Sequence, residues 1–294
     1  MSMSSDGSVD LHAFDFPDDT TSRAAKRVPL KLVAVFVLVS LVWIFASDQV
    51  VDAIFTDAAA RTTAQSLKGI AYVVVTSAVL FLALRFYVIK LNAEHAALED
   101  AWDETILGWA LAMDARESQL ASHSQRVADL TLRLAQHAGI PTTELRTIYR
   151  GALLHDVGKL GVPESVLSHP GRLDDAQWAL IKQHPENAMR MLAPISFLHD
   201  ALDIPHCHHE QWDGSGYPRG LSGDAIPYAA RLFAVVDVYD AVTAFRPYHA
   251  SRTHDEAMAI IRSESGTHFD PAIVTLFSEM MGLRETLAPV AHWR

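Results

Sequence analysis

The sequence predicts an all-α protein in which two transmembrane helices precede a helical bundle domain. Two long apolar runs lie in the N-terminal third, and apolar residues at helical spacing recur from residue 90 to the C-terminus. We find no alternating apolar–polar pattern of the kind that a half-buried strand produces. The 294 residues allow a domain of about 150–200 residues with an appendage.

The N-terminal region contains the two predicted membrane spans. Residues 1–27 are polar and acidic and are expected to form a disordered cytoplasmic tail. Residues 28–46 and 69–89 are apolar on every face, and 19 helical residues reach roughly 28 Å, enough to cross a bilayer. Residues 47–68 between them are mixed in character and are expected to form a short extracytoplasmic loop.

Basic residues predict the orientation of the two spans. They lie before the first span and after the second, with few between, so both termini are expected on the cytoplasmic side. These residues are Arg23, Lys26, Arg27 and Lys31, then Arg61 and Lys68, then Arg85 and Lys90. Each apolar run could instead be a buried core helix, but such a helix normally has an amphipathic pattern, which both runs lack. The first run could also be a cleaved signal peptide, but it ends in "WIFASDQV" without a small-x-small cleavage site.

A helical connector over 90–112 follows the second span without a Gly, Pro or Ser linker. Its apolar residues have spacings of three, four and seven, which is typical of a helix. A continuous helix from the membrane can transmit rotation or tilt, and it can equally be a rigid tether. The spans and this connector also make a homodimer an expectation.

The bundle domain is expected over residues 113–294. Its predicted helices cover 123–140, 143–161, 174–193, 229–245, 254–265 and 271–283. A net charge of −11 argues against a DNA or RNA polymer as partner. The single cysteine, Cys207, excludes an intrachain disulfide framework and fits a reducing compartment.

Histidines and aspartates interrupt the apolar helical pattern of this domain. Thirteen of the 15 histidines lie at or after His123. An ionised Asp237 inside "RLFAVVDVY" is costly to bury unless it is paired or bound to a metal, and Arg231 or Arg126 could supply a plain ion pair. Further candidates are His155, Asp156, His184, His208 and His209. A His/Asp set without thiolates suits Fe, Mn or Zn, so the pattern predicts a metal site.

Four motifs, in order and at these separations, resemble those of the HD-GYP family, a subgroup of the HD metal-dependent phosphohydrolases. They are "HDVGKLGVPESVL", "HHEQWDGSGYPRGLSGDAIP", "VVDVYDAVTAFRPY" and "SGTHFDPAIV". The similarity runs from about Met113 to Leu283. It implies an HD-type helical bundle, a bacterial signalling protein, and an enzyme that hydrolyses cyclic di-GMP to the linear dinucleotide or GMP. Localisation in the bacterial inner membrane, with the catalytic domain in the cytoplasm, follows as an expectation.

The resemblance also implies roles for individual residues. Two divalent metal ions are expected, with Fe or Mn favoured over Zn. His123, His155, Asp156 and Asp237 would hold one metal, and Asp156 would bridge to a second metal that is bound by His184, His208 and His209. The ammonium of Lys159 would lie against a phosphate oxygen. The adjacent pair His208–His209 is expected at a helix end, because successive side chains of a regular helix point apart.

The Gly/Pro-rich loop "DGSGYPRG" would lie beside the second metal. It is expected to shape the substrate pocket or to bind a signalling partner. Asp213, Gly216, Tyr217 and Pro218 in this loop, and Arg246 in "FRPYH", are the candidate substrate contacts. Two positions depart from the family: Gln119 stands where some members have a third-metal Glu, and His249 stands where Lys is common. The former favours two metals over three. The alternatives are a phosphohydrolase acting on another nucleotide and a non-catalytic receptor or scaffold.

Overall fold

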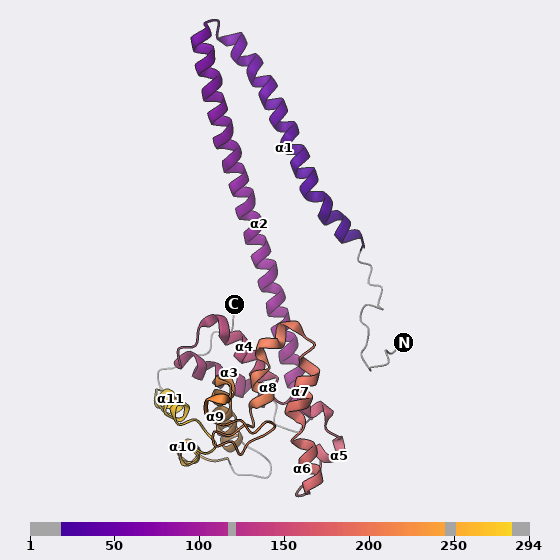
Figure 1. Cartoon of the computed structure of the whole chain (residues 1–294), viewed down its shortest axis with the longest axis vertical. Coiled ribbons are helices and arrows are strands. Elements are labelled where there is room, and N and C mark those ends of the chain that lie inside the picture. The colour runs from indigo at the N-terminus through magenta and orange to yellow at the C-terminus, as the bar shows by residue number, and fades with distance from the viewer. Residues whose placement is uncertain (1–18, 117–121, 245–250, 284–294) are drawn as a thin grey trace. The chain divides into compact units, whose positions relative to one another are not determined.

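The computed structural model describes residues 19–116, 122–244 and 251–283, with side chains from residue 33 onward. These residues contain helices and no strand, which confirms the all-α prediction. In chain order the elements are α1 (Asp19–Ile54), α2 (Ala58–Arg116), α3 (His123–His137), α4 (Thr142–Leu153), η2 (Val157–Gly161), α5 (Glu164–Leu167), α6 (Asp175–Ile181), α7 (His184–Leu192), η3 (Ser196–Ala201), α8 (Asp203–Cys207), η4 (Gly223–Ala225), α9 (Tyr228–Thr243), α10 (His254–Ser263) and α11 (Pro271–Gly282), where η marks a 3-10 helix. Figure 1 shows this order along the chain.

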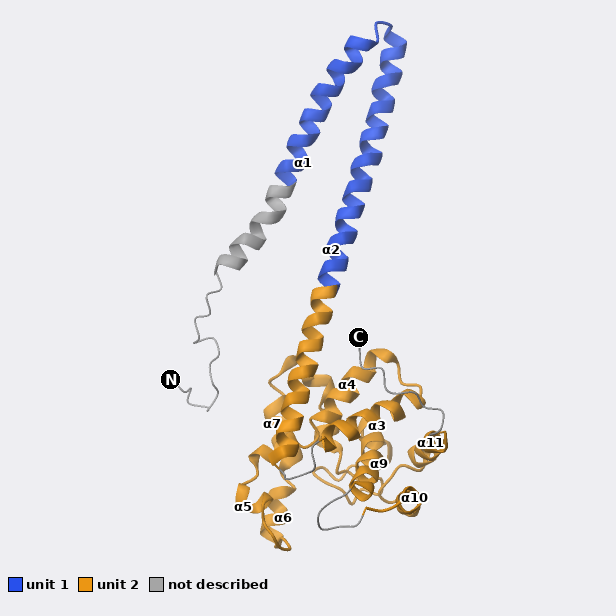
Figure 2. Cartoon of the chain, turned by 180° about the vertical axis from the view of Figure 1, so that it is seen from behind, with its two compact units in different colours: residues 1–92 blue, residues 93–294 orange. Residues whose placement is uncertain are grey.

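The chain divides into two units, Met1–Asn92 and Ala93–Arg294, which Figure 2 colours separately. The first unit contains α1 and the N-terminal part of α2. By length and composition, both helices could cross a membrane, and the most apolar window of each has no buried residue. A signal sequence passes the same test of length and composition.

The polar residues between the two apolar runs do not form the loop expected over 47–68. Both helices continue into this segment, and only residues 55–57 lie outside a helix. The Asp57 carboxylate accepts a hydrogen bond from the Ala60 amide at 2.9 Å, and Arg61 donates to the Phe55 carbonyl at 3.0 Å. These contacts satisfy the free backbone groups at the two helix ends, so the polar residues cap a tight helical hairpin. Helix α1 also begins at Asp19, inside the expected tail, and residues 1–18 lie outside the described residues.

The second unit is built around α3, α4 and α9, whose apolar side chains form one core with α8, α10 and α11. In helix α9 all residues from Leu232 to Val236 are buried. This position explains why its sequence is apolar without a polar face. Its carboxylates, Asp237 and Asp240, follow directly after that buried run.

Two of the helices that we expected are broken in the structure. The helix expected over 174–193 divides into α6 and α7, because Pro185 lacks an N–H and its ring would clash with the Ile181 carbonyl in a continuous helix. The helix expected over 143–161 ends at Leu153, and a 3-10 turn follows from Val157. Both breaks put candidate ligands at helix ends, with His184 opening α7 and the His155–Asp156 pair lying between α4 and η2.

Candidate metal centre

The first ligand group consists of His123, His155 and Asp237, and their candidate ligand atoms all lie within 4.8 Å of one another. His123 opens α3, His155 follows α4, and Asp237 lies on α9. His123 Nε2 is 3.5 Å from Asp237 Oδ1, and the two imidazole rings have centroids 5.5 Å apart. Three core helices thus bring together residues from distant parts of the sequence, from His123 to Asp237.

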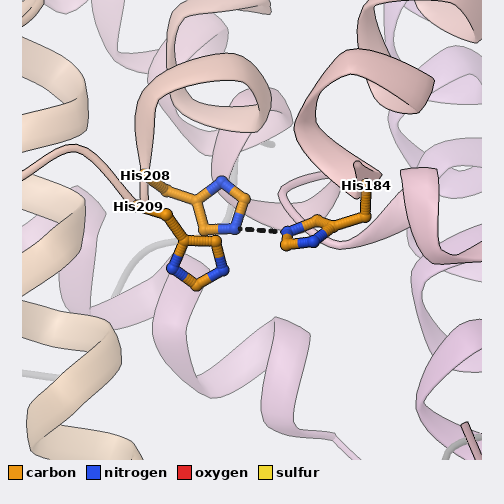
Figure 3. Close-up of side chains that lie close together, drawn as sticks. All are labelled: His184, His208 and His209. Atoms are coloured by element: carbon orange, nitrogen blue, oxygen red, sulfur yellow. Dashed lines mark hydrogen bonds between the residues drawn. The ribbon is translucent and has the colours of Figure 1, made fainter. Parts of the chain in front are cut away.

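The second ligand group consists of His184, His208 and His209, which also meet within 4.8 Å (Figure 3). His184 opens α7, and His208 follows α8, which ends at Cys207. This helix end confirms the expected departure from regular helix at the His208–His209 pair. Ring centroids lie 5.1 Å apart for His184 and His208 and 4.1 Å apart for His208 and His209.

Asp156 lies between the two groups. Its Oδ2 is 3.1 Å from His155 Nε2 in the first group. Its Oδ1 is 3.6 Å from His184 Nε2 and 3.9 Å from His208 Nε2 in the second group. The two oxygens of one carboxylate therefore face different ligand groups, which is the arrangement that a bridging ligand requires.

The Nδ1 atoms of four histidines point away from the centre, each toward an oxygen acceptor. The partners are the Ala152 carbonyl for His155 at 2.8 Å, the Ile181 carbonyl for His184 at 2.8 Å, the Ile204 carbonyl for His208 at 3.0 Å, and the Asp240 carboxylate for His123 at 2.7 Å. Such partners favour a proton on Nδ1 and leave the lone pair on Nε2. In the neutral form of the rings, all four Nε2 lone pairs are then directed to the metal site.

The nitrogen atoms of the second ligand group are arranged as a metal site requires. His184 Nε2 and His208 Nε2 lie 3.1 Å apart, the contact dashed in Figure 3. With both protons on Nδ1, two lone pairs face each other there, and neither ring can donate to the other. A divalent cation between them satisfies both nitrogen atoms, and imidazole with carboxylate suits Fe, Mn or Zn.

The pKa values of these residues favour neutral imidazoles in the second group. Burial lowers the pKa of His208 well below its ordinary value, and neighbouring histidines add to the effect. Burial also lowers the pKa of His209 to about 3, and it lowers the pKa of His184 against the attraction of Asp156. Neutral imidazole is the form that binds metal, so these three side chains are ready to act as ligands at neutral pH.

Carboxylates dominate the electrostatics of the first group. Burial alone would lower the pKa of His155, but the Asp156 carboxylate outweighs burial and raises it to about 9. For the carboxyl of Asp240, burial has the opposite effect and would raise the pKa. Hydrogen bonds from His123 and Arg126 outweigh burial and lower this pKa to about 2. Asp240 is therefore ionised behind His123, where its carboxylate orients the imidazole ring.

The two arginines considered as ion-pair partners of Asp237 bind other carboxylates. Arg126 donates to Asp240 at 2.8 and 2.9 Å, and Arg231 donates to Asp224 and Asp270 at 2.8 and 2.7 Å. The carboxylate of Asp237 is instead left facing His123.

Close backbone contacts fix the second group. A Cβ on Gly158 would lie 1.8 Å from the His184 carbonyl oxygen, and a Cβ on Gly216 would lie 2.6 Å from the His209 carbonyl oxygen. The first glycine therefore lets η2 pack against the start of α7. The second lets the Gly/Pro-rich loop fold back on the His208–His209 segment, where the Tyr217 amide donates to the His209 carbonyl at 3.1 Å.

The candidate substrate contacts are distributed unevenly around the centre. Tyr217 stacks on His209 with ring centroids 4.7 Å apart, and Lys159 Nζ lies 2.7 Å from Asp156 Oδ2. Pro218 follows Tyr217 in the same loop. Asp213 is exposed, and its carboxylate accepts hydrogen bonds from the Ser215 amide and hydroxyl at 2.9 and 2.6 Å, so it shapes the loop turn. Arg246, Gln119 and His249 lie outside the described residues.

The residue that holds this loop in place was not among the predicted site residues. Glu210 is buried, and its carboxylate accepts hydrogen bonds from the backbone amides of Arg219 and Leu221 at 2.8 and 2.9 Å. The signal was an acidic residue directly between the histidine pair and a Gly/Pro-rich stretch with many free backbone amides.

Comparison with known proteins places the chain in a family. The HD domain family matches residues 111–273. The chain is 39% identical over 203 residues to a cyclic di-GMP phosphodiesterase of Vibrio cholerae, covering 64% of this chain and 41% of the relative. It is 36% identical over 190 residues to 3'3'-cGAMP-specific phosphodiesterase 3 of the same organism, with the same two coverages. It thus spans about two fifths of the length of these relatives.

A solved structure shares the fold. The crystal structure of a cyclic GMP-AMP-specific phosphodiesterase from V. cholerae matches with a TM-score of 0.50 at 20% identity, covering 61% of this chain and 48% of that one. The fold, the family match and the motifs "HDVGK" and "HHEQWDGSGYP" agree. The chain therefore belongs to the HD domain family, in its HD-GYP subgroup.

Proposed function

We propose that this chain is a metal-dependent phosphodiesterase that hydrolyses cyclic di-GMP to the linear dinucleotide or GMP. The observation that carries the proposal is the carboxylate of Asp156 between two ligand groups that each contain at least two histidines. A bridged pair of cations is a common solution for in-line displacement at phosphorus. The names of the relatives favour a cyclic dinucleotide as the substrate.

The proposed cofactor is a pair of divalent cations, Fe or Mn in preference to Zn. When bound, the pair supplies Lewis-acid charge to the oxygens around the phosphorus. The first and second ligand groups would hold one cation each, and Asp156 would be a ligand to both. Asp240 keeps the His123 ring in the orientation that directs Nε2 inward.

The remaining residues act on the substrate. The ammonium of Lys159, held by Asp156, stabilises negative charge that develops on a phosphate oxygen. The loop containing Gly216, Tyr217 and Pro218 forms one wall of the pocket beside the second ligand group. Glu210 and Gly216 keep that wall rigid, so the Tyr217 ring does not need to be ordered when substrate binds.

We also propose that α1 and α2 anchor this enzyme in the bacterial inner membrane, with the catalytic domain in the cytoplasm. Their apolar windows are unburied in the structure, as lipid-facing helices are. A helix that served as the core of a soluble domain would be buried instead. Basic residues flank the two spans on the side of the termini, which favours this orientation.

A second candidate substrate is 3'3'-cGAMP. The chain is 36% identical to a 3'3'-cGAMP-specific phosphodiesterase, close to its 39% identity with the cyclic di-GMP enzyme. Both cyclic dinucleotides contain the same two phosphodiester groups and at least one guanine. They differ in one base, so the metal centre described above does not distinguish them.

The test uses the full chain, purified in detergent without oxygen and loaded with Fe or Mn. Hydrolysis of cyclic di-GMP and 3'3'-cGAMP is followed by chromatography of the products, beside an Asp156→Ala control. We expect turnover of cyclic di-GMP that the substitution abolishes. Tight binding of either dinucleotide without turnover would support the receptor function instead, and turnover of 3'3'-cGAMP alone would change the substrate.

A further inference from the structure

Lys182 lies at the edge of the metal centre without a role in the ligand groups. It occupies the turn between α6 and α7, two residues before His184, and its side chain is exposed. Its Nζ lies 5.3 Å from the centroid of the Tyr217 ring, and Tyr217 in turn stacks on His209. The ammonium is therefore held beside the second ligand group by a cation–π contact with the loop.

The charge of Lys182 is available to a ligand. Within the described part of the chain, the contact that its ammonium makes is with the Tyr217 ring and not with a carboxylate. Lys159 differs, because its Nζ lies 2.7 Å from Asp156 Oδ2 and is committed to the metal side of the site. A cation–π contact leaves the N–H donors that point away from the ring free to bind an anion.

The charge of the substrate requires a cation outside the metal pair. A cyclic dinucleotide carries two phosphodiester groups, each with one negative charge, and the metal pair can neutralise only the one that is cleaved. The chain as a whole carries a net charge of −11, so its overall field does not favour a dianion. A lysine beside the metal centre would offset this repulsion for a second phosphate that binds next to the metal pair.

We propose that Lys182, oriented by Tyr217, binds the phosphate of the cyclic dinucleotide that is not being cleaved. This inference rests on the proposed function and adds a residue that selects substrates with two phosphates. A lysine acts here as a point charge rather than a bidentate clamp, so it tolerates different bases on either side of the phosphate.

The experiment compares two diesters on the full, metal-loaded chain and its Lys182→Gln variant. Cyclic di-GMP has a second phosphate, whereas bis(4-nitrophenyl) phosphate has only the one that is cleaved. We expect the substitution to raise KM and Kd for cyclic di-GMP about tenfold, as for one charge-assisted hydrogen bond. We expect kcat/KM for bis(4-nitrophenyl) phosphate to stay within about twofold, and Lys182→Arg to restore most of the affinity.

The matched control is Arg172→Gln, which removes the same charge from an exposed position before α6 and is expected to change neither diester. Equal losses on both diesters in Lys182→Gln would mean that the lysine only supports the loop, and they would overturn the proposal. Unchanged binding of cyclic di-GMP would overturn it as well.

Binding measurements separate this inference from the proposed function. Equilibrium dialysis reports the Kd for cyclic di-GMP whether or not the chain cleaves it. Binding without cleavage by the parent chain would contradict the phosphodiesterase proposal, while the ratio of the two Kd values would still decide the role of Lys182. A parent chain that does not bind cyclic di-GMP would contradict both.

Discussion

The two ligand groups of the metal centre are built from different parts of the bundle and by different means. The first group comes from α3, the end of α4 and α9, which form the apolar core. It contains a carboxylate of its own, Asp237, and a second ionised carboxylate, Asp240, behind His123. The second group is three imidazoles at the ends of the short helices α7 and α8.

This difference shows where the centre is weakest. The first group has negative charge to hold a cation and core packing to hold its residues. The second group has no carboxylate of its own and depends on Asp156 for charge. Its position depends on close backbone contacts at Gly158 and Gly216. We therefore expect the second group to lose its metal first.

Asp156→Asn is expected to have the largest effect, because it removes the only carboxylate that contacts both groups in the described structure. Turnover of cyclic di-GMP should fall by about 10³-fold or more, since the charge that holds the two cations together is lost. The exposed Asp200→Asn provides the control and should keep full activity. Retention of a tenth of the parent activity by Asp156→Asn would disprove the bridging role.

Gly158→Ala tests the contact on which the second group depends. Its Cβ would lie 1.8 Å from the His184 carbonyl oxygen and 2.6 Å from the Ala188 nitrogen, so η2 and α7 must separate. We expect a loss of about 1–3 kcal/mol or more in the free energy of unfolding, with loss of the second metal before the first.

Gly108→Ala is the matched control for that substitution. Gly108 lies inside α2 with nothing within 4 Å of a Cβ, so alanine should stabilise the helix by up to about 1 kcal/mol. Thermal unfolding and metal analysis of both variants make the measurement. Equal metal content and stability in the two variants would show that the close contact at Gly158 does not matter.

Asp240→Asn tests the support behind the first group. The substitution removes the carboxylate that His123 and Arg126 share, and metal affinity at the first group should fall about 10–100-fold. Competition with a chelator measures this affinity. Asp224→Asn, which also removes a carboxylate paired with an arginine, should leave it unchanged. If Asp240→Asn lowered the metal affinity of the second group and left that of the first unchanged, the supporting role of Asp240 behind His123 would be contradicted.

In the metal-free protein the pH should affect the second group through its histidines. Burial lowers the pKa of His209 to about 3, whereas the unfolded chain takes up this proton near its ordinary pKa of about 6.5. The unfolded state then binds more protons, so the free energy of unfolding falls below about pH 6.5, by about 1.4 kcal/mol at pH 5.5 for this side chain. His209→Gln should remove that part of the acid-side loss, as measured by denaturant unfolding of the chelated protein.

The first group should respond in the opposite direction. Against the effect of burial, Asp156 raises the pKa of His155 to about 9, so this stabilisation is complete below about pH 6.5 and is lost as the pH rises toward 9. His155→Gln should flatten the alkaline side of the same profile. If neither histidine substitution changes its own side of the profile of unfolding free energy against pH, the inferred electrostatic difference between the two groups is wrong.

The sequence allowed prediction of the helical fold and of which residues to examine, but not of the way the structure holds them. His155, Asp156 and Asp237 were visible because charged residues inside apolar helices need a partner. The helix break at Pro185, which puts His184 at a helix start, could have been predicted from the proline. We missed it because the apolar residues on both sides keep helical spacing. The helical hairpin at 55–57 was missed because polar residues between apolar runs suggest a loop, whereas here they cap helix ends.

Other features depend on contacts between distant segments and could not be predicted from local sequence. The Nδ1 hydrogen bonds that aim His155, His184 and His208 inward follow from the helix ends that supply the carbonyl groups. The anchoring of the loop by Glu210 depends on the loop folding back over its own start. Lys182 becomes notable only because Tyr217 lies beneath its ammonium.

Titration of the metal-free full chain with Mn(II) under electron paramagnetic resonance tests the central claim most directly, namely that two groups share Asp156 in one centre. The first equivalent should give the spectrum of isolated Mn(II) at the first group. The second equivalent should replace it with that of a coupled pair, and hydrolysis of cyclic di-GMP should appear together with this change. Saturation at one equivalent, or two equivalents without coupling, would contradict a shared bridging carboxylate.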